Sequence, residues 1–301
     1  MSETTHISPL ALINEKLREF AALTKMRLSL TVVFSAALGY VFGSNYSQFN
    51  FGLFALFILA GLLITWSANT FNEVFEKDVD TLMDRTKDRP LPAGKITPSF
   101  GLFIAGTMGV AGILLLWVKF SALAAVLGAV STFSYAFIYT PMKKVSSVAV
   151  FIGAIPGALP PAIGYVCATY PETFNYFTCS LLFFIQFLWQ FPHFWAIGWL
   201  RYDDYLKAGI MMLPSKSGKT RYSSVHAFLY SAFLLIVSIL PYVFGLVGVW
   251  GTTVIVLIGA IFMVTAANLY KHNDDKSAKH LLFASFLYLP IVQLAMVLDK
   301  I

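Results

Sequence analysis

The stretch FGLFALFILAGLLITWSANTF, residues 51–71, carries no charged side chain. An α-helix of this length crosses the hydrocarbon core of a bilayer, which is about 30 Å thick, because each residue adds about 1.5 Å. Strands would instead show shorter apolar runs or a two-residue alternation. Eight more segments share its length and apolar character: 28–46, 98–117, 121–140, 147–168, 174–199, 224–247, 250–270 and 280–298. We therefore expect an all-α, polytopic membrane protein with nine transmembrane helices.

Composition supports this class. Of 301 residues, 58% are hydrophobic and only 12% are charged, whereas soluble domains carry about 25% charged residues. Cys167 and Cys179 are too few for a disulfide framework and lack metal-binding spacing, so we expect small buried residues there. We expect a cytoplasmic N-terminal segment over 1–27, with a short amphipathic surface helix at 10–23, and one transmembrane domain over 28–298.

The basic residues indicate the orientation in the membrane. Nineteen of the 21 Lys and Arg residues fall in the N-terminal segment and in the loops after the second, fourth, sixth and eighth spans, and only Lys119 and Lys300 fall on the other side. The positive-inside rule then places the N-terminus in the cytoplasm and the C-terminus outside. The net charge of +6 needs no nucleic-acid partner to explain it. The N-terminus resembles neither a cleaved signal peptide nor a transit peptide, which favours a bacterial inner (plasma) membrane.

Acidic residues gather on this cytoplasmic side, where six of the 15 lie between positions 73 and 88. Asn72, Glu76 and Asp80 are four residues apart, so on a helix they share one face. Three stacked oxygen ligands suit Mg²⁺, which often joins carboxylates to substrate phosphates. Arg85, Lys87 and Arg89 follow closely enough to hold a diphosphate. The alternative is a solvated loop whose charges pair locally.

A second acidic cluster, Asp203-Asp204, follows the sixth span. An Asp-Asp pair alone is usually a feature of a helix end or a loop. Its position adds meaning, because the second and sixth spans correspond in two possible four-span repeats, and membrane proteins often build one site from two such halves.

Five ordered stretches carry a family resemblance. They are Leu23-Thr24-Lys25-x-Arg27, Asn72 to Leu91, Tyr139 to Lys144, Gly153 to Gly164, and Trp189 to Ala196 leading into Asp204-Tyr205-x2-Ala208-Gly209 and Met212-Leu213-Pro214. Together they resemble the UbiA superfamily of intramembrane prenyltransferases, and more narrowly its protohaem IX farnesyltransferase (haem O synthase) branch. The resemblance covers roughly residues 23–215. Three positions depart from it: Glu76 replaces an Asp, Lys207 stands where a downstream Asp is usual, and Lys144 stands where Arg is frequent.

The resemblance implies helices around a central cavity, and an enzyme that converts haem b to haem O with farnesyl diphosphate and Mg²⁺, for haem A/O biosynthesis. A haem A synthase or the assembly of a terminal oxidase would be partners. Asn72, Glu76 and Asp80 would hold Mg²⁺, with Asp204 on a second ion. The implied diphosphate-binding residues are Arg27, Arg85, Lys143, Lys144 and Lys207. The implied haem or isoprenoid pocket contains Tyr135, Tyr139, Trp189, His193 and Trp195.

Several readings stay open at this point. His193 would contact a propionate, ligate iron or move a proton, or it is a buried structural histidine. The acceptor could instead be an aromatic or quinone precursor. A transporter with an inverted repeat is the non-enzymatic alternative, but its ionisable residues should lie near the membrane midplane rather than at one rim.

Overall fold

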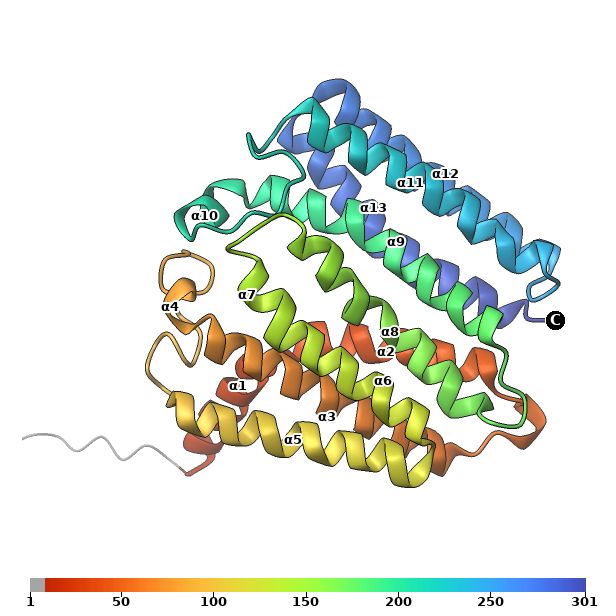
Figure 1. Ribbon diagram of the computed structural model, residues 1–301, viewed down its shortest axis with the longest axis horizontal. Coiled ribbons are helices and arrows are strands. Elements are labelled where there is room, and N and C mark those ends of the chain that lie inside the picture. The colour runs from red at the N-terminus through yellow and green to blue at the C-terminus, as the bar shows by residue number, and fades with distance from the viewer. Residues whose placement is uncertain (1–8) are drawn as a thin grey trace, which may run out of the picture.

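The computed structural model describes residues 9–301, which form a bundle of long helices (Figure 1). Within these residues, nine helical segments are long and apolar enough to cross a membrane, which confirms the expected number. They are α2 (Met26–Gly43), α3 (Phe51–Phe75), α5 (Pro98–Lys119), the continuous segment Ala122–Met142, α8 (Ala149–Thr169), α9 (Tyr176–Leu200), α11 (Arg221–Val243), α12 (Val249–His272) and α13 (Asp275–Leu298). Residues 1–8 of the expected N-terminal segment lie outside the described residues.

Some helix ends differ from the expected ones because capping groups, which hydropathy does not detect, set them. α13 begins five residues before the expected position 280, since the Asp274 side chain accepts a hydrogen bond from the Ser277 amide at 2.8 Å. α11 ends at Val243, before the expected position 247, and Gly245 follows in the left-handed conformation with φ 66°.

The fourth span is not uniformly α-helical. It consists of α6 (Ala122–Phe133), a π-helical turn η2 (Ser134–Tyr139) and α7 (Thr140–Met142). Such π turns inside α-helices often occur at functional sites because they redirect side chains.

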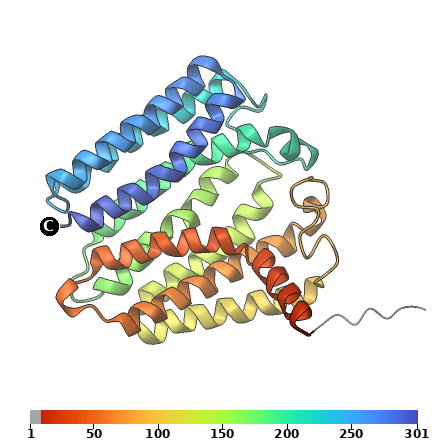
Figure 2. The ribbon, with the colours of Figure 1, turned by 180° about the vertical axis from the view of Figure 1, so that it is seen from behind.

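Helices α8 and α9 form the centre of the bundle. In their apolar 18-residue stretches, 72% and 67% of the residues are buried. α3, α5 and α6 lie on one side of them, and α11, α12 and α13 on the other, while α2 packs against α8 (Figures 1 and 2). Large apolar side chains on the outer helices point outward; Trp117 in α5 and Trp250 in α12 are 62% and 81% exposed. Such a surface is suited to lipid rather than to water.

Three prolines inside α8 free backbone carbonyls, and neighbouring helices bind two of these. Pro161 has no amide for the Gly157 carbonyl, which instead accepts a bond from Gln186 Nε2 in α9 at 2.7 Å. Pro160 similarly frees the Pro156 carbonyl, to which Ser131 Oγ in α6 donates at 3.3 Å. α8 therefore keeps its prolines without leaving these groups unpaired inside the membrane, as membrane helices require.

Two short helices mark one end of the bundle: α4 (Lys77–Asp80), after α3, and α10 (Tyr202–Lys207), after α9 (Figure 1). The C-terminus lies at the other end. The second and sixth spans therefore both lead into acidic segments at the same rim. α1 (Pro9–Leu23) lies at this end too, and its Leu10, Ile13 and Leu17 are exposed.

Candidate active site at the loop end of the bundle

A cavity of about 750 Å³ opens at this end. The α1–α2 junction, the end of α3 with α4 and the following loop, the π turn η2 with Lys143, and the segment after α10 form its walls. Its polar groups include the three predicted metal ligands and five cations: Lys25, Arg27, Arg85, Arg89 and Lys143. Its apolar surface includes Met83, Tyr135, Tyr139, Ile210 and Met212. The cavity thus joins a charged region to an apolar wall.

Asn72, Glu76 and Asp80, hereafter the triad, remain on one face, although the helix that carries them is interrupted. We expected a continuous helix, but α3 ends at Phe75 and Glu76 has φ −96° and ψ 4°. Helical hydrogen bonds nevertheless bridge the break, from the Glu76 amide to the Asn72 carbonyl at 3.0 Å and from the Asp80 amide to the Glu76 carbonyl at 2.7 Å. Asn72 Nδ2 also donates to Glu76 Oε2 at 2.9 Å.

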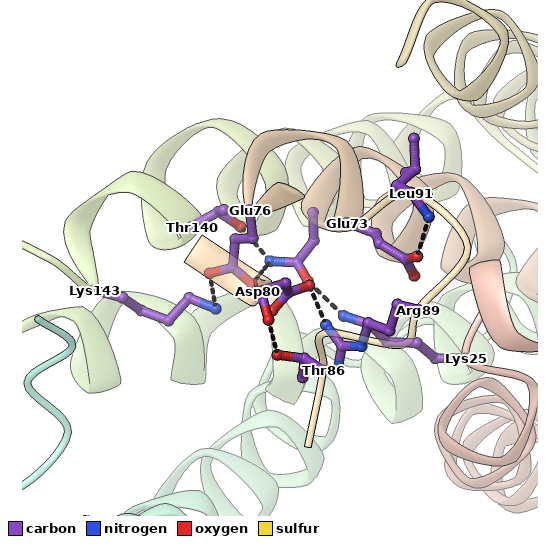
Figure 3. A network of polar contacts seen from close by, with 10 residues as sticks. Lys25, Glu73, Glu76, Asp80, Thr86, Arg89, Leu91, Thr140 and Lys143 are labelled. Carbon is purple, nitrogen blue, oxygen red and sulfur yellow. Dashed lines mark hydrogen bonds and ion pairs between the residues drawn. The ribbon is translucent and has the colours of Figure 1, made fainter. Parts of the chain in front are cut away.

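Each triad side chain contacts a different cation (Figure 3). Lys25 Nζ donates to Asn72 Oδ1. Lys143 Nζ lies 2.5 Å from Glu76 Oε1, and Arg89 Nη1 lies 2.6 Å from Asp80 Oδ2. All three triad residues are buried, and the second oxygen of Asp80, Oδ1, has no hydrogen-bond partner.

The π turn builds another part of this wall. It brings the rings of Tyr135 and Tyr139 within 5.4 Å of each other, centroid to centroid. Thr140 follows the turn and accepts a bond from Asn72 Nδ2 at 2.9 Å, and Lys143 Nζ lies 4.8 Å from the centre of the Tyr139 ring. The turn therefore places two aromatic rings, and the lysine that pairs with Glu76, beside the end of α3.

Burial and charge act against each other on these groups. Burial alone would raise the pKa of Glu76, but Lys143 and Lys25 outweigh it and hold this pKa below its usual value. Burial would likewise lower the pKa of Lys143, yet Glu76 holds it above its usual value. Burial and the neighbouring Arg89 lower the pKa of Lys25 to about 7, although Glu76 acts in the opposite direction. The Lys143–Glu76 pair therefore stabilises the charged form of both partners.

Sequence reasoning left three residues of this site without a specific role. Lys25 has a left-handed backbone, with φ 49°, which turns the chain between α1 and α2 and places its side chain in the cavity. Arg89 was grouped with its neighbours and not paired with Asp80. Glu73 is fully buried and accepts a bond from the Leu91 amide at 3.4 Å. The only signal for Lys25 and Arg89 was their place in the quoted motifs.

A second hollow of about 540 Å³ lies beside the cavity, and it contains Asp204 and Lys207. Lys207 Nζ is 2.7 Å from Asp84 Oδ2, and Asp204 Oδ1 accepts a bond from the Asp84 amide at 3.1 Å. These contacts join the loop after α4 to α10. Arg85 lines both hollows, whereas Lys144 is exposed and lines neither. The structure thus separates Asp204, Lys207 and Lys144 from the triad.

The residues expected to form one haem or isoprenoid pocket fall into three groups. Tyr135 and Tyr139 line the cavity. Trp189 and His193, one helical turn apart on α9, stack at 4.5 Å and both bond to Ser285 in α13. Trp195 lies on another face of α9 and packs against Tyr230 in α11, because two residues along a helix turn a side chain by about 200°. Trp189, His193 and Trp195 do not line the cavity.

The hydrogen bonds of His193 define its tautomer. Ser285 Oγ donates to the Leu282 carbonyl at 2.6 Å, so it accepts at 2.7 Å from His193 Nδ1. This assignment leaves Nε2 of a neutral ring with its lone pair.

The fold matches solved structures of other membrane proteins. A digeranylgeranylglyceryl phosphate synthase superposes with a TM-score of 0.79 at 21% identity, over 95% of this chain and 98% of that chain. A UbiA homologue from Archaeoglobus fulgidus bound to GPP and Mg²⁺ superposes with a TM-score of 0.71 at 15% identity, over 92% of this chain and 99% of that chain. At these identities the likeness shows the shared fold.

Sequence relatives give the family. The model of the UbiA prenyltransferase family matches residues 32–289. A protoheme IX farnesyltransferase from Cytophaga hutchinsonii is 43% identical over 279 residues, which are 93% of this chain and 96% of the relative. The protoheme IX farnesyltransferase of Christiangramia forsetii is 40% identical over 305 residues, covering 100% of this chain and 98% of the relative. The resemblance drawn from the motifs is confirmed: this chain belongs to the UbiA prenyltransferase family and, within it, to the protoheme IX farnesyltransferases.

Proposed function

We propose that this membrane enzyme transfers the farnesyl group of farnesyl diphosphate to a vinyl group of haem b, giving haem O, with Mg²⁺ bound by the triad. The cavity carries this proposal. It places two carboxylates, an amide and five cations beside an apolar wall at the membrane rim. A prenyl diphosphate has the matching form, an anionic head on an apolar tail. The names of the relatives, protoheme IX farnesyltransferases, indicate haem as the acceptor.

The triad fits a hard divalent cation. Within residues 9–301, no three His, Cys, Asp or Glu side chains converge as a metal site, and the triad instead joins two carboxylates to an amide oxygen. Mg²⁺ prefers oxygen ligands of this kind and needs only one or two carboxylates from the protein. Asp80 Oδ1, buried and without a partner, is an oxygen free to accept it. The complex of the Archaeoglobus fulgidus homologue with GPP and Mg²⁺ supports this choice.

In the reaction, the bond between farnesyl C1 and the diphosphate oxygen breaks, and its electron pair leaves with the diphosphate. Bound Mg²⁺ would supply charge stabilisation to that leaving group. Arg27, Arg85 and the three basic residues that contact the triad would hold its other oxygens. The faces of Tyr135 and Tyr139 would stabilise the allylic cation. The vinyl carbon of haem then bonds to C1, and water adds to the resulting carbocation with loss of a proton.

Other site residues keep proposed roles. Asp204 could bind a second ion, and Lys207 and Lys144 could reach the diphosphate, after a movement of the loops that carry them. His193 remains our candidate for contact with haem, because its bond to Ser285 leaves Nε2 with a lone pair. Trp189 would orient the His193 ring by stacking, and Trp195 would support the same helix.

For location, we propose the bacterial plasma membrane, with the N-terminus and the catalytic rim in the cytoplasm. The distribution of basic residues supports this orientation, since nineteen of 21 lie in segments on the catalytic side. The product would pass to a haem A synthase or to the assembly of a terminal oxidase.

The decisive experiment uses the full chain in lipid nanodiscs with haem b, farnesyl diphosphate and Mg²⁺. We expect a later-eluting haem by chromatography, with the mass of haem b plus a farnesyl group and a hydroxyl group, and none when Mg²⁺ is chelated. Asn72→Ala should abolish it. Prenylation of a phenolic acid without any prenylated haem would overturn the assignment of the acceptor.

A further inference from the structure

The triad has a one-to-one set of cationic partners. Lys25 binds Asn72, Lys143 binds Glu76 and Arg89 binds Asp80 (Figure 3). The three cations come from separate parts of the chain: the α1–α2 junction, the end of the fourth span and the loop after α4. The side chains of Lys143 and Arg89 are only 12% and 19% exposed, and those of their partners 9% and 1%. These are therefore pairs with little access to water.

Charge disfavours a bare metal ion in this cavity. Five cations and two carboxylates line it. A divalent ion alone would add to the positive excess and would have to displace the cations from the triad. A prenyl diphosphate carries more negative charge than one divalent ion neutralises, so the complex of the two stays anionic. The cavity should therefore favour the complex over the free metal.

We propose that Lys143 and Arg89 are exchangeable counter-ions, and Lys25 an exchangeable hydrogen-bond donor, which bind the triad before substrate arrives and transfer to the diphosphate oxygens when the metal takes their place. Metal and diphosphate then bind together, and the metal alone binds weakly. The inference rests on the proposed function only in taking the triad as the metal site and the prenyl diphosphate as its ligand.

The structure allows this exchange locally. A buried charge that loses its partner is strongly destabilised unless another partner replaces it, and the diphosphate offers that replacement. Lysine ammonium groups move on flexible stems, so Lys25 and Lys143 can change partners without moving the helices. Glu73 binds the Leu91 amide, two residues after Arg89. This bond anchors the loop while the Arg89 side chain turns from Asp80 to an incoming anion.

The test separates metal binding from diphosphate binding. Electron paramagnetic resonance measures Mn²⁺ bound to the full chain in nanodiscs without diphosphate. Radiolabelled farnesyl thiodiphosphate, which resists ionisation, is then titrated with Mg²⁺ or with EDTA. Because coupling between two ligands is reciprocal, the ratio of the two analogue affinities reports it. We expect weak binding of Mn²⁺ alone and binding of the analogue that is about 10- to 100-fold tighter with Mg²⁺.

Variants distinguish exchange from a merely structural role. Arg89→Gln and Lys143→Gln should tighten binding of Mn²⁺ alone, because they free a carboxylate, while the coupling ratio falls by several fold. Arg89→Lys should restore the ratio. Lys219→Gln is the matched control, since Lys219 pairs with Asp275 at 2.8 Å outside the cavity. Melting temperatures identify any variant that fails to fold. If the glutamine variants fail to fold, the ratio of analogue affinities with Mg²⁺ and with EDTA is measured in Arg89→Lys, where we expect it to equal that of the wild type.

Two results would overturn the proposal. One is binding of Mn²⁺ to the wild type that is equally tight with and without the analogue. The other is weaker binding of both metal and analogue in Arg89→Gln and Lys143→Gln. Neither measurement uses haem. Loss of coupling in an enzyme that makes haem O would therefore refute only the exchange, and intact coupling without haem O would refute only the proposed acceptor.

Discussion

Single charged side chains in this site have two roles, because the charges that would bind substrate also form buried ion pairs within the folded protein. Asp80 is fully buried, and its carboxylate contacts Arg89. Glu76 stands where the family resemblance implies Asp, yet its longer side chain reaches both Asn72 and Lys143. A substitution here therefore changes ligand binding and folding together, and informative variants keep the shape of the side chain.

We expect Asp80→Asn to lower the rate of farnesyl transfer by about 100-fold or more, because it removes the charge of a side chain that would bind Mg²⁺, and Mg²⁺ would stabilise the leaving diphosphate. Glu76→Asp keeps the carboxylate and should stay within about tenfold of the wild type. Initial rates of haem O formation measure both. Equal rates for Asp80→Asn and wild type would remove Asp80 from the metal site.

Two adjacent lysines provide a second comparison. Lys143 is in a buried ion pair with Glu76, whereas Lys144 is exposed. Lys143→Gln should weaken the binding of farnesyl thiodiphosphate and destabilise the protein by about 3 kcal/mol, since Glu76 loses its partner. Lys144→Gln should have a much smaller effect on both quantities, within about 0.5 kcal/mol for stability. Equal losses of affinity would show that Lys144 reaches the diphosphate after all.

Among the helices, α8 shows how polar backbone groups are managed inside a membrane. Its prolines free carbonyls, and Gln186 and Ser131 bind two of these. The same helix approaches α2 so closely that a Cβ at Gly164 would lie 2.0 Å from the Ala36 carbonyl oxygen. Small residues permit this contact between backbones, as in other packed membrane helices. The prolines and glycines of α8 therefore serve close packing against the neighbouring helices.

Gly164→Ala should therefore destabilise the bundle by about 1–3 kcal/mol, because α2 and α8 must separate to admit the methyl group. Gly106→Ala in α5 is the control, since no atom lies within 4 Å of the added Cβ. Alanine favours helix more than glycine does, so this control should keep or raise the melting temperature. Thermal unfolding in one detergent compares the two variants. An unchanged melting temperature for Gly164→Ala would contradict the close α2–α8 contact.

The whole molecule is polarised along the membrane normal. One end carries the cavity, both acidic helices and α1, and the other end carries the C-terminus (Figure 1). In the proposed orientation, basic side chains at the end with the cavity would serve two purposes, since they would orient the chain in the membrane and supply charge to the site. This arrangement differs from a transporter, whose binding site lies near the midplane. A site at the rim accepts a charged head from one aqueous side while the tail stays among apolar groups.

Cysteine labelling tests this polarity at the two ends of α5. Lys95 precedes the helix and Lys119 ends it, and both are exposed. In a chain with Cys167→Ala and Cys179→Ala, a membrane-impermeant maleimide should label Lys119→Cys in intact bacterial cells. It should label Lys95→Cys only after permeabilisation. The reverse pattern would invert the proposed orientation and move the cavity to the outer face.

The sequence by itself determined the nine spans and the end of the bundle at which the predicted metal ligands lie. Both follow from local properties: the length of each apolar run and the charge of each loop. The spacing of the triad was also sufficient to place Asn72, Glu76 and Asp80 together, because helical hydrogen bonds persist across the break at Glu76.

Only the tertiary structure decided which cation meets which ligand. Lys25 and Asn72 are 47 residues apart, and the pairing of Lys143 with Glu76 depends on how the fourth span packs against α3. It also decided that Trp189, His193 and Trp195 lie outside the cavity, and that Asp204 and Lys207 contact Asp84 in a neighbouring hollow. Such contacts join segments distant along the chain, so they depend on the rotation and packing of whole helices, which local hydropathy and spacing do not specify.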